Sequence, residues 1–237
     1  SSRSTLDFED TQDGIETSCD LIIDLTGAPP LFTGWEKRDG YLRVSADDSV
    51  RLAAVAAEAG EMIGAFEKPI YVDYDSELCA HSRNSLNGCS RCLDVCPAGA
   101  ITSIGDTVEI DPAVCGGCGY CGAVCPSGAA QTALPAADGF GRQMAGLIEH
   151  YMDAGGKTPR LLLADDGHGS EMIDIIARLG PGLPPDLLPL TMHSTRRVGH
   201  DLLVIAIAQG YEQVFVLANP NQAAESPQTM PALELAP

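Results

Sequence analysis

The chain has 237 residues and a formal net charge of −19, and it is long enough for two domains or for one domain with a large insertion. Such an acidic chain would be repelled by the phosphates of nucleic acids, so nucleic-acid binding is not expected. No apolar run approaches the roughly 20 residues of a membrane-spanning helix and no secretory signal is visible, so we expect a cytoplasmic protein without a membrane span.

The first elements form an N-terminal part of two segments. Residues 1–18 are polar and acidic without apolar periodicity, which predicts a flexible lead-in. Residues 19–25 form an apolar run that predicts a buried strand, with Cys19 at its head as a small core residue. An α/β segment is therefore expected to begin at Cys19 and to extend to residue 75.

The rest of this α/β segment is predicted from periodicity. Residues 41–44 predict a short strand, and residues 50–66 predict an alanine-rich helix whose apolar positions recur at i, i+3 and i+4. We expect that apolar stripe to face a core. Residues 69–74 predict another strand, which leads the chain to Cys79.

Two cysteine runs follow in the segment predicted as the next domain, residues 76–135. Residues 115–126 read C-x2-C-x2-C-x3-C-P, and residues 89–97 read C-x2-C-x3-C-P. This is the spacing of an iron–sulfur cluster loop, in which glycines ease the curl of the chain round the cluster. In the upstream run Leu86 occupies the position of the first cysteine, and the nearest replacement is Cys79.

Over about residues 70–133 the chain resembles the bacterial-type two-cluster ferredoxin family. The resemblance rests on the two runs and on their near-identical tails, Cys96-Pro97-Ala98-Gly99-Ala100 and Cys125-Pro126-Ser127-Gly128-Ala129. It implies a pseudo-twofold domain that binds two [4Fe–4S] clusters, with the last cysteine of each run crossing to the other cluster. The implied ligands of the first cluster are Cys79, Cys89, Cys92 and Cys125. Those of the second cluster are Cys96, Cys115, Cys118 and Cys121.

Other interpretations of the cysteines remain. Zinc ribbons also use paired C-x2-C units, but a zinc site has no use for a third cysteine or for the repeated C-P. A disulfide framework is disfavoured because seven of the nine cysteines cluster at ligand spacing between residues 89 and 125. For Cys79 the alternative is a buried free thiol, which would leave a three-iron cluster or a ligand other than cysteine.

Between the two runs, residues 100–104 and 107–111 flank Gly105-Asp106 and predict a hairpin whose apolar residues cover one cluster. Residues 136–237 predict a C-terminal α/β domain. It begins with a helix around residues 144–152, and a βαβαβ pattern occupies residues 160–217, which indicates a parallel sheet covered on both faces.

The loops that leave the carboxyl ends of these strands are expected to meet at one edge of the sheet. They contain His168, His193, Arg196 and Arg197, together with two acidic residues. The functional interpretation is an anion or metal site, which would make an enzyme possible. The alternative is that these loops are merely polar and that the histidines are exposed or cap helices.

Residues 160–220 are also similar to the small iron–sulfur subunit of methyl-viologen-reducing hydrogenase, a family that relays electrons. The similarity rests on a helix–glycine–strand pattern at residues 193–199 and 206–217. That family places cluster-ligating cysteines in the corresponding loops, whereas this chain has no cysteine after Cys125. The similarity therefore implies a docking or scaffolding module without a cluster of its own.

These observations predict a mixed α+β and α/β fold, in which a two-[4Fe–4S] ferredoxin-like domain is flanked by an N-terminal α/β segment and a C-terminal parallel-sheet βαβαβ domain. The predicted function is single-electron transfer between a redox enzyme and an acceptor, with no catalytic residue in this chain. Because the chain is so acidic, we expect a partner with a basic docking face. The alternative function is a structural protein or a sensor of oxygen or redox state.

Overall fold

The structure is a computed structural model that describes residues 19–28, 31, 40–64, 67–81 and 88–220. The lead-in expected over residues 1–18 lies outside the described residues. The chain divides into two compact units, which are described separately below. The first comprises residues 1–30 and 39–64, and the second comprises residues 31–38 and 65–237.

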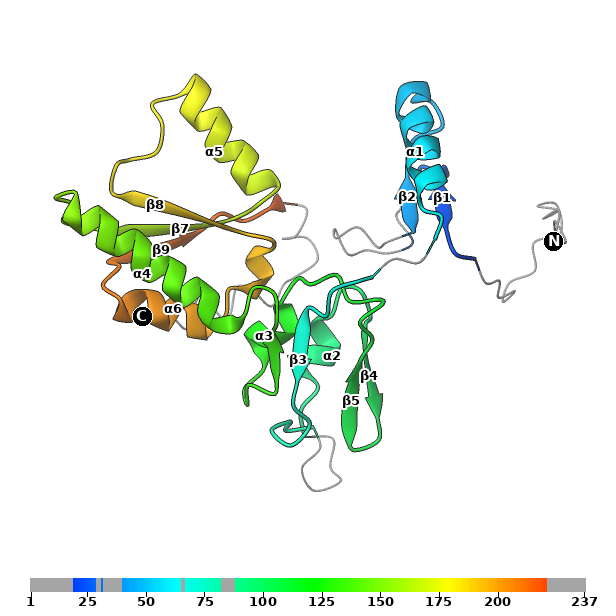
Figure 1. The fold of residues 1–237 in the computed structure, drawn as a ribbon, viewed down its shortest axis with the longest axis horizontal. Coiled ribbons are helices and arrows are strands. Elements are labelled where there is room, and N and C mark those ends of the chain that lie inside the picture. Colours follow the sequence, from blue (N-terminus) through cyan, green and yellow to red (C-terminus); the bar gives the residue numbers. More distant parts are fainter. Residues whose placement is uncertain (1–18, 29–30, 32–39, 65–66, 82–87, 221–237) are drawn as a thin grey trace, which may run out of the picture. The chain divides into compact units, whose positions relative to one another are not determined.

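The first unit is a small parallel sheet with one helix (Figure 1). Strand β1 (Ile22–Asp24) pairs in parallel with β2 (Tyr41–Arg43), and helix α1 spans Ser49–Glu61. The Asp48 side chain accepts the N–H of Arg51 at 3.0 Å and so caps the first turn of α1. The small core of this unit contains Leu42, Val44 and Val55.

Two expectations for the first unit are wrong. The strand near Cys19 has only three residues, Cys19 itself is exposed, and Ile23 is 39% exposed. The buried apolar stripe of α1 is also shorter than predicted. The helix ends at residue 61, and Val50 and Ile63, which were expected to face a core, are 81% and 82% exposed. The physical reason is that a sheet of two strands offers only a narrow surface for side chains to cover.

The cysteine-rich part of the second unit repeats a strand–helix–strand order (Figure 1). The first copy consists of β3 (Val72–Tyr74), α2 (Arg91–Val95) and β4 (Ile101–Ile104), and the second of β5 (Thr107–Ile110), α3 (Tyr120–Val124) and β6 (Ala130–Thr132). Strand β3 pairs with β6 and β4 pairs with β5, both antiparallel. The predicted hairpin is therefore confirmed, with Ile101 opposite Ile110.

The remainder of the second unit begins with α4 (Ala137–Asp153) and then alternates strands and helices. These are β7 (Arg160–Asp165), α5 (His168–Leu179), β8 (Leu187–Met192), the 3-10 turn η3 (Thr195–Arg197), α6 (His200–Ala208) and β9 (Gln213–Val216). The sheet has the order β8-β7-β9 and is parallel throughout. The connection from β7 to β8 and the connection from β8 to β9 cross the sheet in opposite directions. Right-handed connections therefore place α5 and α6 on opposite faces of the sheet (Figure 1).

The core of this part lies between α4, α6 and the sheet. Met144 of α4 is 1% exposed, and Leu161 and Leu163 of β7 are 0% and 1% exposed. The buried Tyr211 hydroxyl donates to the Met144 carbonyl at 2.8 Å, which fixes α4 to the turn before β9. The strand and helix order expected over residues 160–217 agrees with these elements, and η3 is an additional turn before the last helix.

Among the helices in the described ranges, none is both long enough and apolar enough to cross a membrane. The assignment of the whole chain to a ferredoxin-like domain with two α/β flanks stays a prediction. So do its boundaries at residues 18, 75 and 135.

Candidate iron–sulfur site

Four of the predicted ligands surround one cavity of the second unit. Cys79 lies in the turn after β3, Cys89 and Cys92 lie before and within α2, and Cys125 follows α3. All four line the same cavity, and Cys79 is only 8% exposed. We call this the first cavity. Its fourth cysteine, Cys125, comes from the downstream run, residues 115–126.

The other four predicted ligands surround a second cavity, made by Cys96, Cys115, Cys118 and Cys121. Cys96 comes from the end of α2, and the other three come from the loop that leads into α3 and from α3 itself. Ile101 and Ile110 of the hairpin also line this cavity, so apolar side chains of β4 and β5 shield it. Such shielding lowers the local dielectric constant.

The proximity of the thiols within each cavity affects their ionisation. Burial, followed by the neighbouring thiols of Cys79 and Cys89, raises the pKa of Cys92 to about 11. Burial, followed by the neighbouring thiols of Cys115 and Cys96, raises the pKa of Cys121 to about 12. Several buried thiolates so close together repel one another, and a bound positive centre would relieve that repulsion.

Cys125 has the opposite shift. Burial opposes its ionisation, but hydrogen bonds from the backbone of Ala130, Ser127 and Ala129 and from the Ser127 hydroxyl outweigh burial and lower its pKa. The Ala130 N–H lies 3.5 Å from the Cys125 sulfur, and the Ala100 N–H lies 3.3 Å from the Cys96 sulfur. Each C-P tail thus aims a backbone donor at its own last cysteine, an arrangement that stabilises a thiolate and tunes reduction potential.

The loop before α3 depends on its glycines. Gly117 has a φ of +78°, and a Cβ there would lie 2.9 Å from the ring of Tyr71. Gly119 has a φ of +75°, and a Cβ there would lie 2.9 Å from the Cβ of Arg197. The expectation that glycines allow this loop to curl is confirmed at both positions, because side chains rarely adopt such φ values.

The chemistry of these donors fits a four-iron cluster in each cavity. None of the nine cysteines, all of which lie in the described residues, forms a disulfide. Within the described part of the chain, no group of three or more His, Cys, Asp or Glu side chains is arranged to hold a single metal ion. A cubane cluster takes one thiolate on each of four irons and so needs four cysteines around a wider space.

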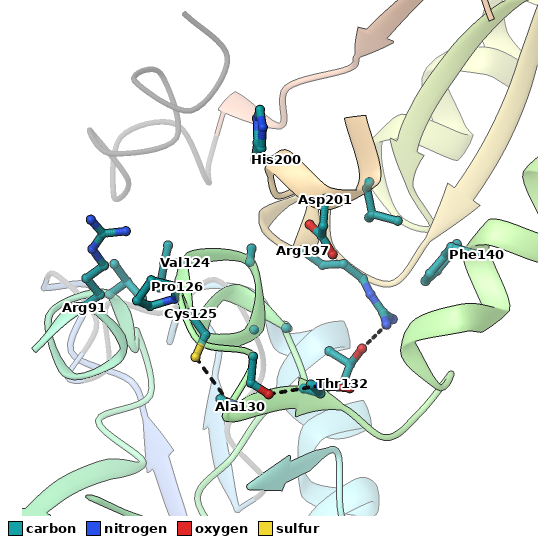
Figure 2. A pocket seen from close by; sticks show the side chains of 17 residues that line it. Arg91, Val124, Cys125, Pro126, Ala130, Thr132, Phe140, Arg197, His200 and Asp201 are labelled. Carbon is teal, nitrogen blue, oxygen red and sulfur yellow. Dashed lines mark hydrogen bonds between the residues drawn. The ribbon is translucent and has the colours of Figure 1, made fainter. Parts of the chain in front are cut away.

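A groove adjoins the first cavity (Figure 2). It has a volume of about 1060 Å³, and its wall shares Arg91, Cys125, Pro126 and Ala130 with the first cavity. Residues of η3 and α6 line its other side, including Arg197, His200 and Asp201. The groove therefore lies between the cysteine-rich part and the C-terminal part of the second unit.

Arg197 joins these two parts. Its guanidinium donates to the Thr132 hydroxyl and, at 2.9 Å, to the Pro135 carbonyl, and it lies over the Phe140 ring at 4.4 Å from the centroid (Figure 2). Burial lowers the pKa of Arg197, and the nearby Asp201 carboxylate partly offsets that effect. Gly199 packs nearby, since a Cβ there would lie 2.8 Å from the Ala123 carbonyl oxygen of α3.

The polar edge of the parallel sheet was interpreted above as a possible anion or metal site, and the arginines there are placed differently from what that interpretation expects. Arg196 and Arg197 are 2% and 8% exposed, and Arg197 turns away from the edge towards Phe140. His193 is about half exposed and lies 3.5 Å from the Asp166 carboxylate, while His168 begins α5. The two arginines of this edge are therefore buried, and Arg197 packs on the Phe140 ring.

Two side chains that line the first cavity or the groove were not predicted from the sequence to lie there. No role was predicted for His81, yet it is 4% exposed and lines the first cavity. Arg197 was assigned to a polar loop, and its partners lie about 60 residues earlier in the chain. The only sequence signal for His81 is its position two residues after Cys79.

Comparison with known proteins bears on the cysteine runs. Residues 87–129 match a family model described as a 4Fe-4S dicluster domain. The match includes both C-P-terminated runs but begins after Cys79, and it supports a ferredoxin-type iron–sulfur role in electron transfer for this segment. No match was found among curated proteins. The similarity of residues 160–220 to the hydrogenase subunit stays a prediction.

Proposed function

We propose that this chain is an electron-transfer protein or subunit that binds two [4Fe–4S] clusters. Cys79, Cys89, Cys92 and Cys125 would hold one cluster, and Cys96, Cys115, Cys118 and Cys121 would hold the other. Each cluster, when bound, supplies a centre that accepts and releases one electron. The chain itself would provide the thiolates, the N–H groups aimed at sulfur and the apolar shield of the hairpin.

One observation carries the proposal: eight cysteines divide into two sets of four around two cavities, within and next to a segment that matches a 4Fe-4S dicluster family. The division follows the crossed pattern of two-cluster ferredoxins, since Cys96 and Cys125 each leave their own run. A zinc ribbon or a disulfide framework gives no reason for this exchange.

The proposal extends to partner and location. A net charge of −19 favours a redox partner with a basic docking face, and the C-terminal part of the second unit would fix the docking geometry. A reducing cytoplasm suits eight thiols held without disulfides. Electron transfer to such a partner is expected to slow as ionic strength rises, because salt screens the attraction between the two proteins.

The direct test is the cofactor content of anaerobically prepared protein. We expect about eight irons and eight acid-labile sulfides per chain, visible absorbance that bleaches with dithionite, and electron paramagnetic resonance from two interacting centres. Cys79→Ala is expected to reduce iron to about seven or four per chain, through a three-iron cluster or loss of the first cluster. Four irons in the parent protein, unchanged in the variant, would refute the first site.

A sensor of oxygen or redox state is the second candidate. It would be favoured by an exposed, labile first cluster, whereas Cys79 is 8% exposed. Partner affinity before and after mild air oxidation distinguishes the two functions. A sensor changes its affinity, whereas a carrier keeps its affinity and loses electron flow.

A further inference from the structure

Three cysteines of each cavity follow one another closely in the chain, and the three of the first cavity have the wider spacing. Nine residues separate Cys79 from Cys89, whereas only two separate Cys115 from Cys118. A short spacing holds two thiols together through the chain itself. A long one leaves their separation to be fixed by other contacts, because a ten-residue span has many accessible conformations.

His81, two residues after Cys79, provides a contact to Cys89 at the far end of this interval and a second contact to β4. Its Nδ1 lies 2.6 Å from the carbonyl oxygen of Cys89, and its Nε2 lies 2.9 Å from the hydroxyl of Ser103 in β4. The ring is 4% exposed, so water cannot substitute easily for either partner. A carbonyl oxygen only accepts, so Nδ1 carries the proton and donates, and in the neutral ring Nε2 accepts from Ser103.

From this geometry we propose that His81 is a positioning residue, which holds Cys79 and Cys89 at the spacing that a cluster requires. The inference rests on the proposed iron–sulfur function. The hydrogen bond to Cys89 joins the start of the interval to its end. The bond to Ser103 ties both ends to the hairpin that also lines the second cavity.

The same contacts exclude His81 as a substitute ligand. A histidine binds iron through an unprotonated ring nitrogen, and the one such nitrogen here is the Nε2 that faces Ser103. Cys79 remains the fourth donor that lines the cavity, and its own N–H donates to the Ser76 carbonyl at 3.3 Å. His81 therefore acts through the cysteines on either side of it.

Three substitutions separate the two nitrogens of the ring. His81→Asn places an amide N–H near the position of Nδ1 and can keep the bond to Cys89. His81→Gln places its amide near Nε2 and can keep only the bond to Ser103. His81→Ala loses both, and His150→Ala is a matched control, because that exposed histidine also has Nδ1 2.7 Å from a carbonyl, that of Gly146.

The experiment uses the full chain, loaded anaerobically, and measures iron release to a chelator and the three-iron signal after mild oxidation. We expect His81→Ala and His81→Gln to lose iron from the first cluster roughly tenfold faster or more, because both lose the buried hydrogen bond to Cys89. His81→Asn keeps that bond and is expected to release iron more slowly than either, and His150→Ala is expected to match the parent. The signal of the second cluster should not change, which shows that the variants fold.

Two results would overturn the inference: iron release at the parental rate in both His81→Ala and His81→Gln, or equally fast release from all three His81 variants. If His81→Ala does not fold, the comparison of Asn with Gln still decides. Failure of the proposed function gives a different result, since the parent protein would then lack two four-iron clusters before any substitution.

Discussion

Removal of the Arg197 side chain should weaken the join between the cysteine-rich part and the parallel sheet. Arg197→Ala loses a charged hydrogen bond to the Pro135 carbonyl, another to Thr132, and the stacking on Phe140. Such bonds contribute about 1.5–3 kcal/mol each and the stacking about 0.5–2 kcal/mol. The cost of burying the charge, which also lowers the pKa of Arg197, offsets part of this. We expect a net loss of about 3 kcal/mol.

The loss can be measured as hydrogen exchange at the buried amides of Leu161 and Leu163 in β7. About 3 kcal/mol corresponds to exchange roughly 100-fold faster, if these amides exchange through unfolding of the second unit. The control is Arg178→Ala, since the Arg178 side chain is 78% exposed and pairs with Asp174 on the surface of α5. Exchange in Arg197→Ala within threefold of the parental rate would refute the account of this join.

Three further outcomes are expected. Gly119→Ala should lower iron content more than Gly99→Ala. Both positions have a positive φ, but of the two only Gly119 would bring the new Cβ against other atoms, at 2.9 Å. Equal losses of iron in the two variants would contradict this. Tyr211→Phe should destabilise the core by about 1–2 kcal/mol in urea unfolding, because the Met144 carbonyl loses its donor; an unchanged midpoint would contradict it. The first unit should lose stability as the pH falls from about 4 to about 2, which can be measured by NMR on the methyl resonances of Leu42. Hydrogen bonds from the Thr26 and Tyr41 side chains lower the pKa of Asp24 to about 2, so the ionised form is favoured by folding and is lost as pH falls; Asp24→Asn should remove this dependence.

Predictions that depended on local chain spacing agree best with the structure. The resemblance carried by the two cysteine runs implied the two sets of cysteines that line the two cavities, although their binding of clusters stays a proposal. The hairpin and the alternation of strands and helices after residue 160 were likewise visible, because hydrophobic periodicity reports local geometry directly.

Predictions that depended on distant partners were less accurate. Cys19 begins an apolar run that is typical of a buried strand, but its exposure is decided by how few strands the sheet contains. Arg197 is buried because Thr132, Pro135 and Phe140, far away in the chain, satisfy its guanidinium. No pattern in a single sequence predicts such contacts between residues far apart in the chain.

The exchange of cysteines between the two runs has a consequence for biosynthesis. The wall of the first cavity contains Cys79 and Cys125, so a growing chain cannot complete it until the second run has left the ribosome and α3 has formed. Helix α3 in turn packs against η3, and Gly199, just before α6, approaches Ala123 of α3. Delivery of iron and sulfide should therefore follow synthesis of most of this chain, and a ribosome stalled before residue 125 would present neither a complete first cavity nor a folded α3.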